Sequence, residues 1–161
     1  MSPITVVDIG FNSGLPQTVY SLVMIGIVLA INSTVIVRTI LFFKESLQKT
    51  GKSSKLRANL LFVMCTQILA LAQLGLIAIW AASLLLIGLF LDWESSLRFS
   101  ASSYTTMGIF TVEMPDGWHL VPTFIAFSGL FSFAWAATST LSMLGALTHY
   151  LDAVAVKHAP K

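Results

Sequence analysis

The sequence predicts an all-α membrane protein with three transmembrane helices and a short re-entrant helix and loop between the second and the third. The 161 residues are 56% hydrophobic and only 10% charged, whereas a soluble domain usually contains about 25% charged residues. Three stretches are long and apolar enough to cross a bilayer, which takes about 20 residues. A fourth stretch, residues 92–119, lies between the last two and is too short and too polar to cross.

The composition excludes several other classes. A net charge of only +2 gives no basic surface for nucleic acid. The single cysteine, Cys65, cannot form an internal disulfide and is expected to be a small core residue. Residues 1–17 contain Asp8 and no basic stretch, so we expect no cleaved signal peptide.

The first predicted helix covers residues 18–43 and has Arg38 as its only charge. The long stem of this arginine lets its guanidinium reach the headgroups. Voltage sensors use several arginines in register, so one arginine is weak evidence for a sensor. We expect this helix to lie at the periphery and to face lipid.

The second and third predicted helices cover residues 58–91 and 120–148. The second contains no charge and is longer than one bilayer crossing, so we expect it to tilt or to extend past the headgroups. Residues 51–54, Gly-Lys-Ser-Ser, form a predicted flexible turn before it.

Charges in the connections predict the orientation. The first connection and the C-terminal tail carry most of the basic residues, which are Lys44, Lys49, Lys52, Lys55, Arg57, Lys157 and Lys161. The second connection carries acidic residues opposed by Arg98, which are Asp92, Glu94, Glu113 and Asp116. Basic loops lie on the cytoplasmic side. The C-terminus is therefore predicted to be cytoplasmic and the N-terminus to lie outside.

The stretch after residue 91 predicts a short helix followed by a loop. Asp92 is a candidate N-cap, and the helix is expected to end near Tyr104. Its apolar surface is predicted to come from Leu97, Phe99, Ala101 and Tyr104. Met107-Gly108 is then a turn or an extended stretch, Pro115-Asp116-Gly117 is a turn signal, and Trp118 is placed like an interfacial anchor.

Irregular backbone at membrane depth is tolerated only where protein buries it or where it lines a water-filled cavity. One copy of this segment cannot bury itself. Several copies are therefore expected to meet around an axis, which is an argument for an oligomeric pore.

Residues 100–110 read S-A-S-S-Y-T-T-M-G-I-F. Together with the rest of residues 97–112, Trp118 and the third helix, they resemble the pore module of tetrameric potassium channels. The closest resemblance is to small bacterial two-helix-pore channels that read S-A-S-T-Y-T-T-L-G-Y-G-D-V, and it covers residues 58–148. It implies a homotetramer in which Thr106, Met107 and Gly108 occupy filter positions. Hydroxyl and carbonyl oxygens there replace the ion's hydration shell.

The chain departs from this pattern at three positions. Ile109 stands in place of tyrosine, Phe110 in place of the second glycine, and Thr111 in place of aspartate. A left-handed backbone costs a residue with a Cβ about 1–2 kcal/mol, and Arg98 stands where the family often has an aromatic partner. The struts of a narrow filter are therefore expected to be absent. Positions Thr105–Phe110 are expected to pass cations such as K⁺ or Na⁺ with weak selectivity, or rings of Ile109 or Phe110 would close the mouth by dewetting.

Polar and small residues recur on one face of the third helix. The predicted cavity-lining residues are Ser128, Ser132, Trp135, Ser139 and Met143, and Gly129 resembles the family's bending glycine. Close helix packing is the alternative, because it favours the same residue types. Thr111, Glu113 and Asp116 are predicted to form the outer mouth; the two carboxylates would form an acidic ring or would be solvated loop residues.

The remaining polar residues indicate no enzyme. Asn32, Gln67 and Gln73 are expected to form interhelical hydrogen bonds. His119, His149 and His158 lack metal-ligand spacing, and no catalytic arrangement lies at membrane depth. We therefore expect no enzyme activity, no bound metal and no organic cofactor.

The predicted organisation has two parts. Residues 1–57 form an N-terminal outer segment, a peripheral helix and a basic loop, and residues 58–161 form the pore module. The expected function is an ion-channel subunit in a bacterial inner membrane, with itself, the bilayer and permeant ions as partners. A non-conducting structural or regulatory subunit of a membrane complex is the alternative. The T-T-M-G run argues against a third hypothesis, a transporter or redox-complex anchor with a coincidental loop.

Overall fold

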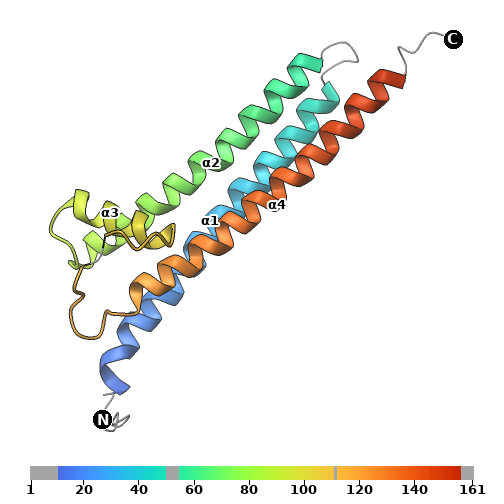
Figure 1. The fold of residues 1–161 in the computed structure, drawn as a ribbon. Helices are drawn as coiled ribbons and strands as arrows, with labels where there is room; N and C mark the ends of the chain where they lie inside the picture. The colour runs from blue at the N-terminus through green and yellow to red at the C-terminus, as the bar shows by residue number, and fades with distance from the viewer. Residues whose placement is uncertain (1–10, 50–54, 111, 157–161) are drawn as a thin grey trace, which may run out of the picture. The chain divides into compact units, whose positions relative to one another are not determined.

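The computed structural model describes residues 11–49, 55–110 and 112–156, and these residues form four helices and no strand (Figure 1). The helices are α1, Phe11–Lys49; α2, Lys55–Leu86; α3, Trp93–Tyr104; and α4, Val121–Val156. Three of them are long and apolar enough to cross a membrane, over Gly14–Lys49, Lys55–Leu86 and Val121–Ala155. The chain is therefore all-helical, and its helices fit a multi-pass membrane protein as the sequence predicts.

The second long helix is shorter at its C-terminal end than predicted. Gly88 has a φ of 77°, which a residue without a Cβ adopts easily. Its N–H donates to the Leu85 carbonyl at 3.0 Å, and the Leu89 N–H donates to the Leu84 carbonyl at 3.1 Å. This pair of bonds is a Schellman motif. The predicted extension of the helix to residue 91 is therefore wrong, because Gly88 ends it after Leu86.

The contacts divide the chain into two units, and each long helix contributes to both. Unit 1 comprises Met1–Val28 and Ile77–Leu130, and unit 2 comprises Leu29–Leu76 and Phe131–Lys161. These are regions of packing, and they do not test the predicted boundary at residue 57.

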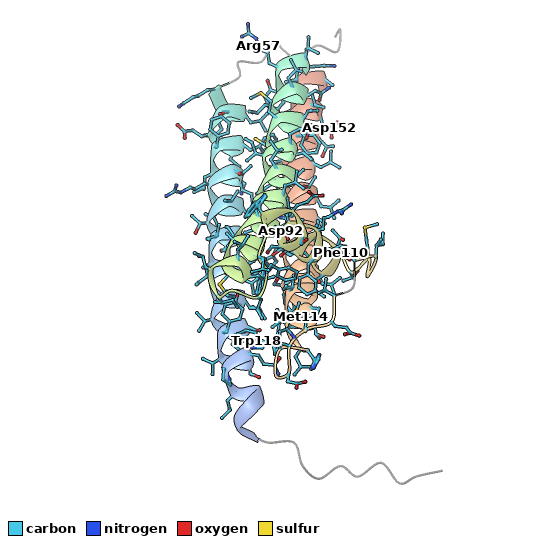
Figure 2. All side chains as sticks on the ribbon, turned by 90° about the vertical axis from the view of Figure 1, so that its left-hand side faces the viewer. Arg57, Asp92, Phe110, Met114, Trp118 and Asp152 are labelled. Atoms are coloured by element: carbon cyan, nitrogen blue, oxygen red, sulfur yellow. The ribbon has the colours of Figure 1, made fainter. Side chains whose placement is uncertain are left out.

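In unit 1, aromatic and polar side chains join α1 to α2 and to the start of α4. The hydroxyls of Tyr20 and Ser83 hydrogen-bond at 2.7 Å, and the Tyr20 ring packs edge-on against Trp80 and Trp118. The Leu120 N–H, one residue before α4, donates to the Gln17 carboxamide at 3.2 Å. Trp118, predicted as an interfacial anchor, is thus packed against α1 (Figure 2).

In unit 2, α1, α2 and α4 share an apolar core. Its buried residues are Ile36, Phe43, Leu47, Ala58, Cys65, Leu69, Met143 and Leu147. The Gln73 carboxamide donates to Asn32 at 3.2 Å, and this pair is buried. The predictions for Cys65, Asn32 and Gln73 are therefore confirmed, whereas the Gln67 side chain is exposed.

Several predictions concern residues outside the described part of the chain. These residues are Asp8, Thr111, Lys157, His158, Lys161 and the predicted turn over residues 51–54, which includes Lys52. Among the described charges, Arg38 is exposed on α1, and Lys49 forms an ion pair with Glu45 at 2.5 Å.

Candidate functional site

The candidate site begins with the capped N-terminus of α3. Asp92 is the N-cap, with φ −127° and ψ 149°, and its carboxylate accepts a hydrogen bond from the Ser95 backbone N–H at 2.7 Å. This bond holds the pKa of Asp92 below its usual range. Glu94 adds a second negative charge in the first turn, near the positive end of the helix dipole. The predicted start of the short helix is therefore confirmed.

The buried face of α3 is richer in serine than predicted. Its buried residues are Ser96, Phe99, Ser100, Ser102 and Tyr104, whereas Leu97 and Ala101 are only half-buried. The Ser96 hydroxyl donates to the Ala81 carbonyl of α2 at 2.7 Å. Small side chains on this face let α3 lie close to its neighbours. The bond to Ala81 gives the buried Ser96 hydroxyl the hydrogen-bond partner that a buried polar group needs.

On α4, Gly129 receives the C-terminal end of α3. A Cβ on Gly129 would overlap the carbonyl of Tyr104 and crowd its ring. Tyr104 is fully buried, and α4 continues as a helix through Gly129. The structure thus gives this glycine a packing role. The predicted hinge at Gly129 stays a prediction.

Two crossed hydrogen bonds end α3 in a second Schellman motif. The Thr106 N–H donates to the Ser103 carbonyl and the Met107 N–H to the Ser102 carbonyl, both at 3.0 Å. Thr106 occupies the position that glycine usually fills, with a φ of 59°. A β-branched residue in this conformation is a genuine outlier. The strain therefore lies at the threonine that the resemblance places in the filter.

The Thr106 hydroxyl donates to the Thr105 carbonyl at 2.7 Å, and the Thr105 hydroxyl donates to the Ala101 carbonyl at 2.7 Å. Both threonine side chains are thus bonded to backbone carbonyls of the same chain. Gly108 also has a positive φ, 62°, so the glycine in T-T-M-G is used for its conformational freedom.

The loop after Gly108 is attached to α3 by two contacts. The Phe110 N–H donates to the Ser102 hydroxyl at 3.0 Å. The Arg98 guanidinium lies 5.8 Å from the centroid of the Phe110 ring, within the range of a cation–π interaction, and it pairs with Glu94 at 3.6 Å. These two contacts attach the loop to α3. They are not the struts of the family pattern, whose expected absence stays a prediction.

The rest of the loop is exposed in a single chain. Met107 and Ile109 are 63% and 76% exposed, and Thr106 and Gly108 are exposed as well. Figure 2 shows Phe110 on the loop beyond α3. A pocket of about 350 Å³ lies between α3, this loop and the first turns of α4, lined among others by Phe99, Thr106, Phe110 and Thr123.

The predicted outer-mouth residues follow this loop. Glu113 and Asp116 are exposed, and Asp116 lies 3.7 Å from His119. The Trp118 N–H donates to the Pro115 carbonyl at 3.0 Å, and Gly117 has a φ of 84°, which is characteristic of a type II turn. The predicted turn is therefore confirmed, and Thr111, the third predicted mouth residue, lies outside the described residues.

The predicted cavity-lining face of α4 is buried inside the chain. Ser128 and Ser132 are fully buried, and Ser139 and Met143 are 8% and 1% exposed. The Trp80 indole N–H donates to the Ser128 hydroxyl at 3.0 Å. Trp135, by contrast, is 44% exposed. Residues covered by their own chain cannot line a space between copies, so the packing alternative describes Ser128, Ser132, Ser139 and Met143. Cavity lining by Trp135 stays a prediction.

The site offers hydroxyl and carbonyl oxygens, and acidic groups only at its edge. Among the described residues, no group of three or more His, Cys, Asp or Glu residues is placed to hold a metal ion. Oxygen atoms of this kind suit weakly held monovalent cations. Comparison with models of protein families, with curated proteins and with solved structures finds no match for this chain.

Sequence reasoning missed three contacts of the site. Ser102 accepts the Phe110 N–H, and Gly129 receives Tyr104. Ser96, Ser100 and Ser103 recur at helical spacing, which was a usable signal for close packing. Nothing in the sequence pairs Arg98 with Phe110.

Proposed function

We propose that this chain is the pore-forming subunit of an ion channel with potassium-channel-like architecture, in which four copies bring Thr105–Phe110 together around one axis. The observation that carries the proposal is the exposed loop at the end of a docked helix. Ser96 and Gly129 fix α3 within one chain, while Thr106, Met107, Gly108 and Ile109 remain exposed. Backbone exposed in this way at membrane depth needs other copies to cover it or water to solvate it.

The proposed permeant ions are monovalent cations such as K⁺ and Na⁺. The ligands would be the Thr106 hydroxyl and the carbonyls of Met107 and Gly108. Ile109 and Phe110 replace the residues that shape a narrow outer filter in the resembling family, so selectivity is proposed to be weak. No organic cofactor and no catalysis belong to this function.

The proposed pore wall differs from the one that the sequence suggested. Because Ser128, Ser132 and Met143 are buried, the wall is assigned to the exposed face of α4, which includes Leu130, Ala137 and Leu141. An apolar wall of this kind gates readily by dewetting. The proposed location is a bacterial inner membrane, with the N-terminus outside and the C-terminus in the cytoplasm. The basic first connection supports this orientation through the positive-inside rule.

One observation favours the alternative, a non-conducting structural or regulatory subunit of a membrane complex. The Thr106 hydroxyl is bonded to the Thr105 carbonyl, so two of the oxygens near the expected ion path are engaged with each other. In a non-conducting subunit, this bond would keep the loop in a conformation that does not bind ions.

Ion flux into liposomes tests the proposal. Purified protein should pass K⁺ and Na⁺ above the background of protein-free liposomes, with little preference between them. Assembled oligomers without flux of any common cation or anion would support the alternative. The triple variant Ile109→Tyr, Phe110→Gly, Thr111→Asp should sharpen selectivity for K⁺, and unchanged selectivity would show that these residues are not the filter.

A further inference from the structure

Three polar side chains of α3, one helical turn apart, lie on one face of the helix and act on one loop residue. They are Glu94, Arg98 and Ser102, and side chains four residues apart are neighbours on a helix surface. The Arg98 guanidinium pairs with the Glu94 carboxylate at 3.6 Å and lies 5.8 Å from the centroid of the Phe110 ring. The Ser102 hydroxyl accepts the Phe110 backbone N–H at 3.0 Å. One face of α3 therefore holds both the ring and the backbone of Phe110.

The three contacts of this α3 stripe contribute in different ways. Ser102 is only 8% exposed, so its bond to the loop is shielded from water. The side chains of Arg98 and Glu94 are 65% and 79% exposed, and an exposed ion pair adds little stability. The part that we assign to Glu94 is therefore to restrict the direction of the guanidinium, which then faces the Phe110 ring.

Phe110 is placed differently from the residues before it. Met107 and Ile109 are 63% and 76% exposed, whereas Phe110 is half-buried. The exposed part of the loop thus ends at the residue that the α3 stripe binds. Met107 and Ile109 are available to other copies, while Phe110 is turned back toward its own chain.

The helix α4 does not hold the ring in the same way. Phe110 borders the pocket of about 350 Å³, which is also lined by Thr123 and Ala126 of α4. Atoms that border empty space lack contacts on that side. The position of the Phe110 ring is therefore set mainly by α3.

This position matters for the proposed ion path. Phe110 stands where the resembling family has the second glycine of its filter. Four phenyl rings turned toward a shared axis would form an apolar constriction, and such constrictions close a pore by dewetting. Rings held against α3 of their own chains leave the axis open.

We infer that the α3 stripe is a positioning device that keeps Phe110 out of the ion path. Arg98 is the positioning residue for the ring, Glu94 orients Arg98, and Ser102 fixes the backbone. The inference rests on the proposed function for the existence of an ion path, and it specifies what keeps the outer mouth of that path open.

Amide hydrogen exchange in the full-length protein tests the positioning. Arg98→Met keeps a long side chain without the charge, and it should raise the exchange rate of the Phe110 amide about two- to five-fold, the factor expected for an exposed cation–π contact. Arg98→Lys keeps a cation and should lie between the two. The matched control is Lys55→Met, which removes the same charge from the start of α2 in unit 2. Equal exchange in Arg98→Met and the unmodified protein would overturn the inference.

Fluorinated phenylalanine at position 110 isolates the interaction between the ring and the guanidinium. Successive fluorine atoms weaken the negative face of the ring, which attracts the cation, and change its shape little. Exchange at the Phe110 amide should rise stepwise with fluorination in the unmodified protein, and this dependence should vanish in Arg98→Met. A response to fluorination that is the same in both proteins would show that Arg98 does not hold the ring.

Ion flux into liposomes tests the consequence for the mouth. Arg98→Met should lower the flux of K⁺ and Na⁺ alike, and in a Phe110→Ala background the same substitution should no longer lower it. Higher cation flux after Arg98→Met in both backgrounds would mean that Arg98 acts only as a repelling charge. Faster exchange with unchanged flux would mean that the released ring stays away from the ion path. Either result would overturn the inference.

Failure of the inference and failure of the proposed function give different results. If the unmodified protein shows no flux but exchange responds to Arg98→Met and to fluorination as expected, the channel is removed and the attachment of Phe110 to α3 stands. If flux is present and neither exchange nor flux responds to Arg98→Met, the channel stands and the positioning device is removed.

Discussion

Gly129 of α4 lies against the carbonyl of Tyr104, the last residue of α3, so closely that a side chain on Gly129 would overlap it. The other end of α3 is held to α2 by the bond from Ser96 to the Ala81 carbonyl. These contacts place the first residue of the loop, Thr105. The geometry of the candidate site therefore depends on residue 129 being glycine, which has no side chain.

Gly129→Ala should destabilise the docking of α3. Overpacking of a tight contact costs about 1–3 kcal/mol, so the free energy of unfolding should fall by this amount, and amide hydrogen exchange in the loop should accelerate. Gly26→Ala is the control, because a Cβ there meets nothing. If both variants behave alike, the contact with Tyr104 is not tight. A role of Gly129 only as a hinge predicts altered gating without the loss of stability.

Thr106→Gly should stabilise the end of α3. The left-handed conformation costs a residue with a Cβ about 1–2 kcal/mol, and glycine removes that strain at an entropic cost of about 0.5–1 kcal/mol. We expect slower hydrogen exchange at the Met107 amide. Thr105→Gly is the comparison, since Thr105 has a φ of −85° and gains nothing from glycine. A less protected Met107 amide in Thr106→Gly would contradict the strained cap.

Ser102→Ala should loosen the loop at Phe110. It removes the acceptor of the Phe110 N–H, and a hydrogen bond of this kind contributes about 1 kcal/mol. The exchange rate of the Phe110 amide should therefore rise about five-fold by that energy. Ser103→Ala is the matched control on the next residue, because only its backbone carbonyl is used. Equal exchange in both variants would show that the Ser102 hydroxyl does not hold the loop.

The buried pair of Asn32 and Gln73 should be energetically coupled. Gln73→Leu removes a bond of 3.2 Å and leaves the Asn32 carboxamide with one partner fewer. A double-mutant cycle with Asn32→Leu should give a coupling of about 0.6 kcal/mol, the average for polar pairs in membrane proteins. Unfolding in mixed micelles measures it. Additive effects of the two substitutions would mean that the amides do not interact.

The cap at Asp92 predicts an acid-dependent α3. The bond from the Ser95 N–H lowers the pKa of Asp92 in the folded protein below its unfolded value of about 3.9. The cap is therefore fully stabilising above that value, and its contribution is lost as the pH falls through the folded pKa. Exchange at the Ser95 amide, corrected for its intrinsic pH dependence, should stay constant from pH 7 to 5 and rise only below about 4. Asp92→Asn caps without titrating, so the same acid response in that variant would rule out Asp92 as its source.

Local features of this protein were readable from the sequence. The long apolar stretches give three membrane-compatible helices, Asp92 caps the short helix, and Pro115-Asp116-Gly117 forms a turn. Each of these depends on residues close together in the chain, where composition, capping and turn preferences act directly. The end of α2 also depends on residues close together in the chain. It was not predicted, because Gly88 lies within an apolar run whose hydropathy is that of a continuing membrane helix.

The tertiary structure alone decided which faces meet. The serine stripe of α4 suits a wet cavity and close packing equally well, and only its contact with Trp80, 48 residues away, assigns it to the interior. In the same way, the placement of Arg98 over Phe110 and of Tyr104 against Gly129 follows from how α3 docks. Small and polar residues in a membrane helix do not by themselves show what they contact, because close packing and contact with water favour the same side chains.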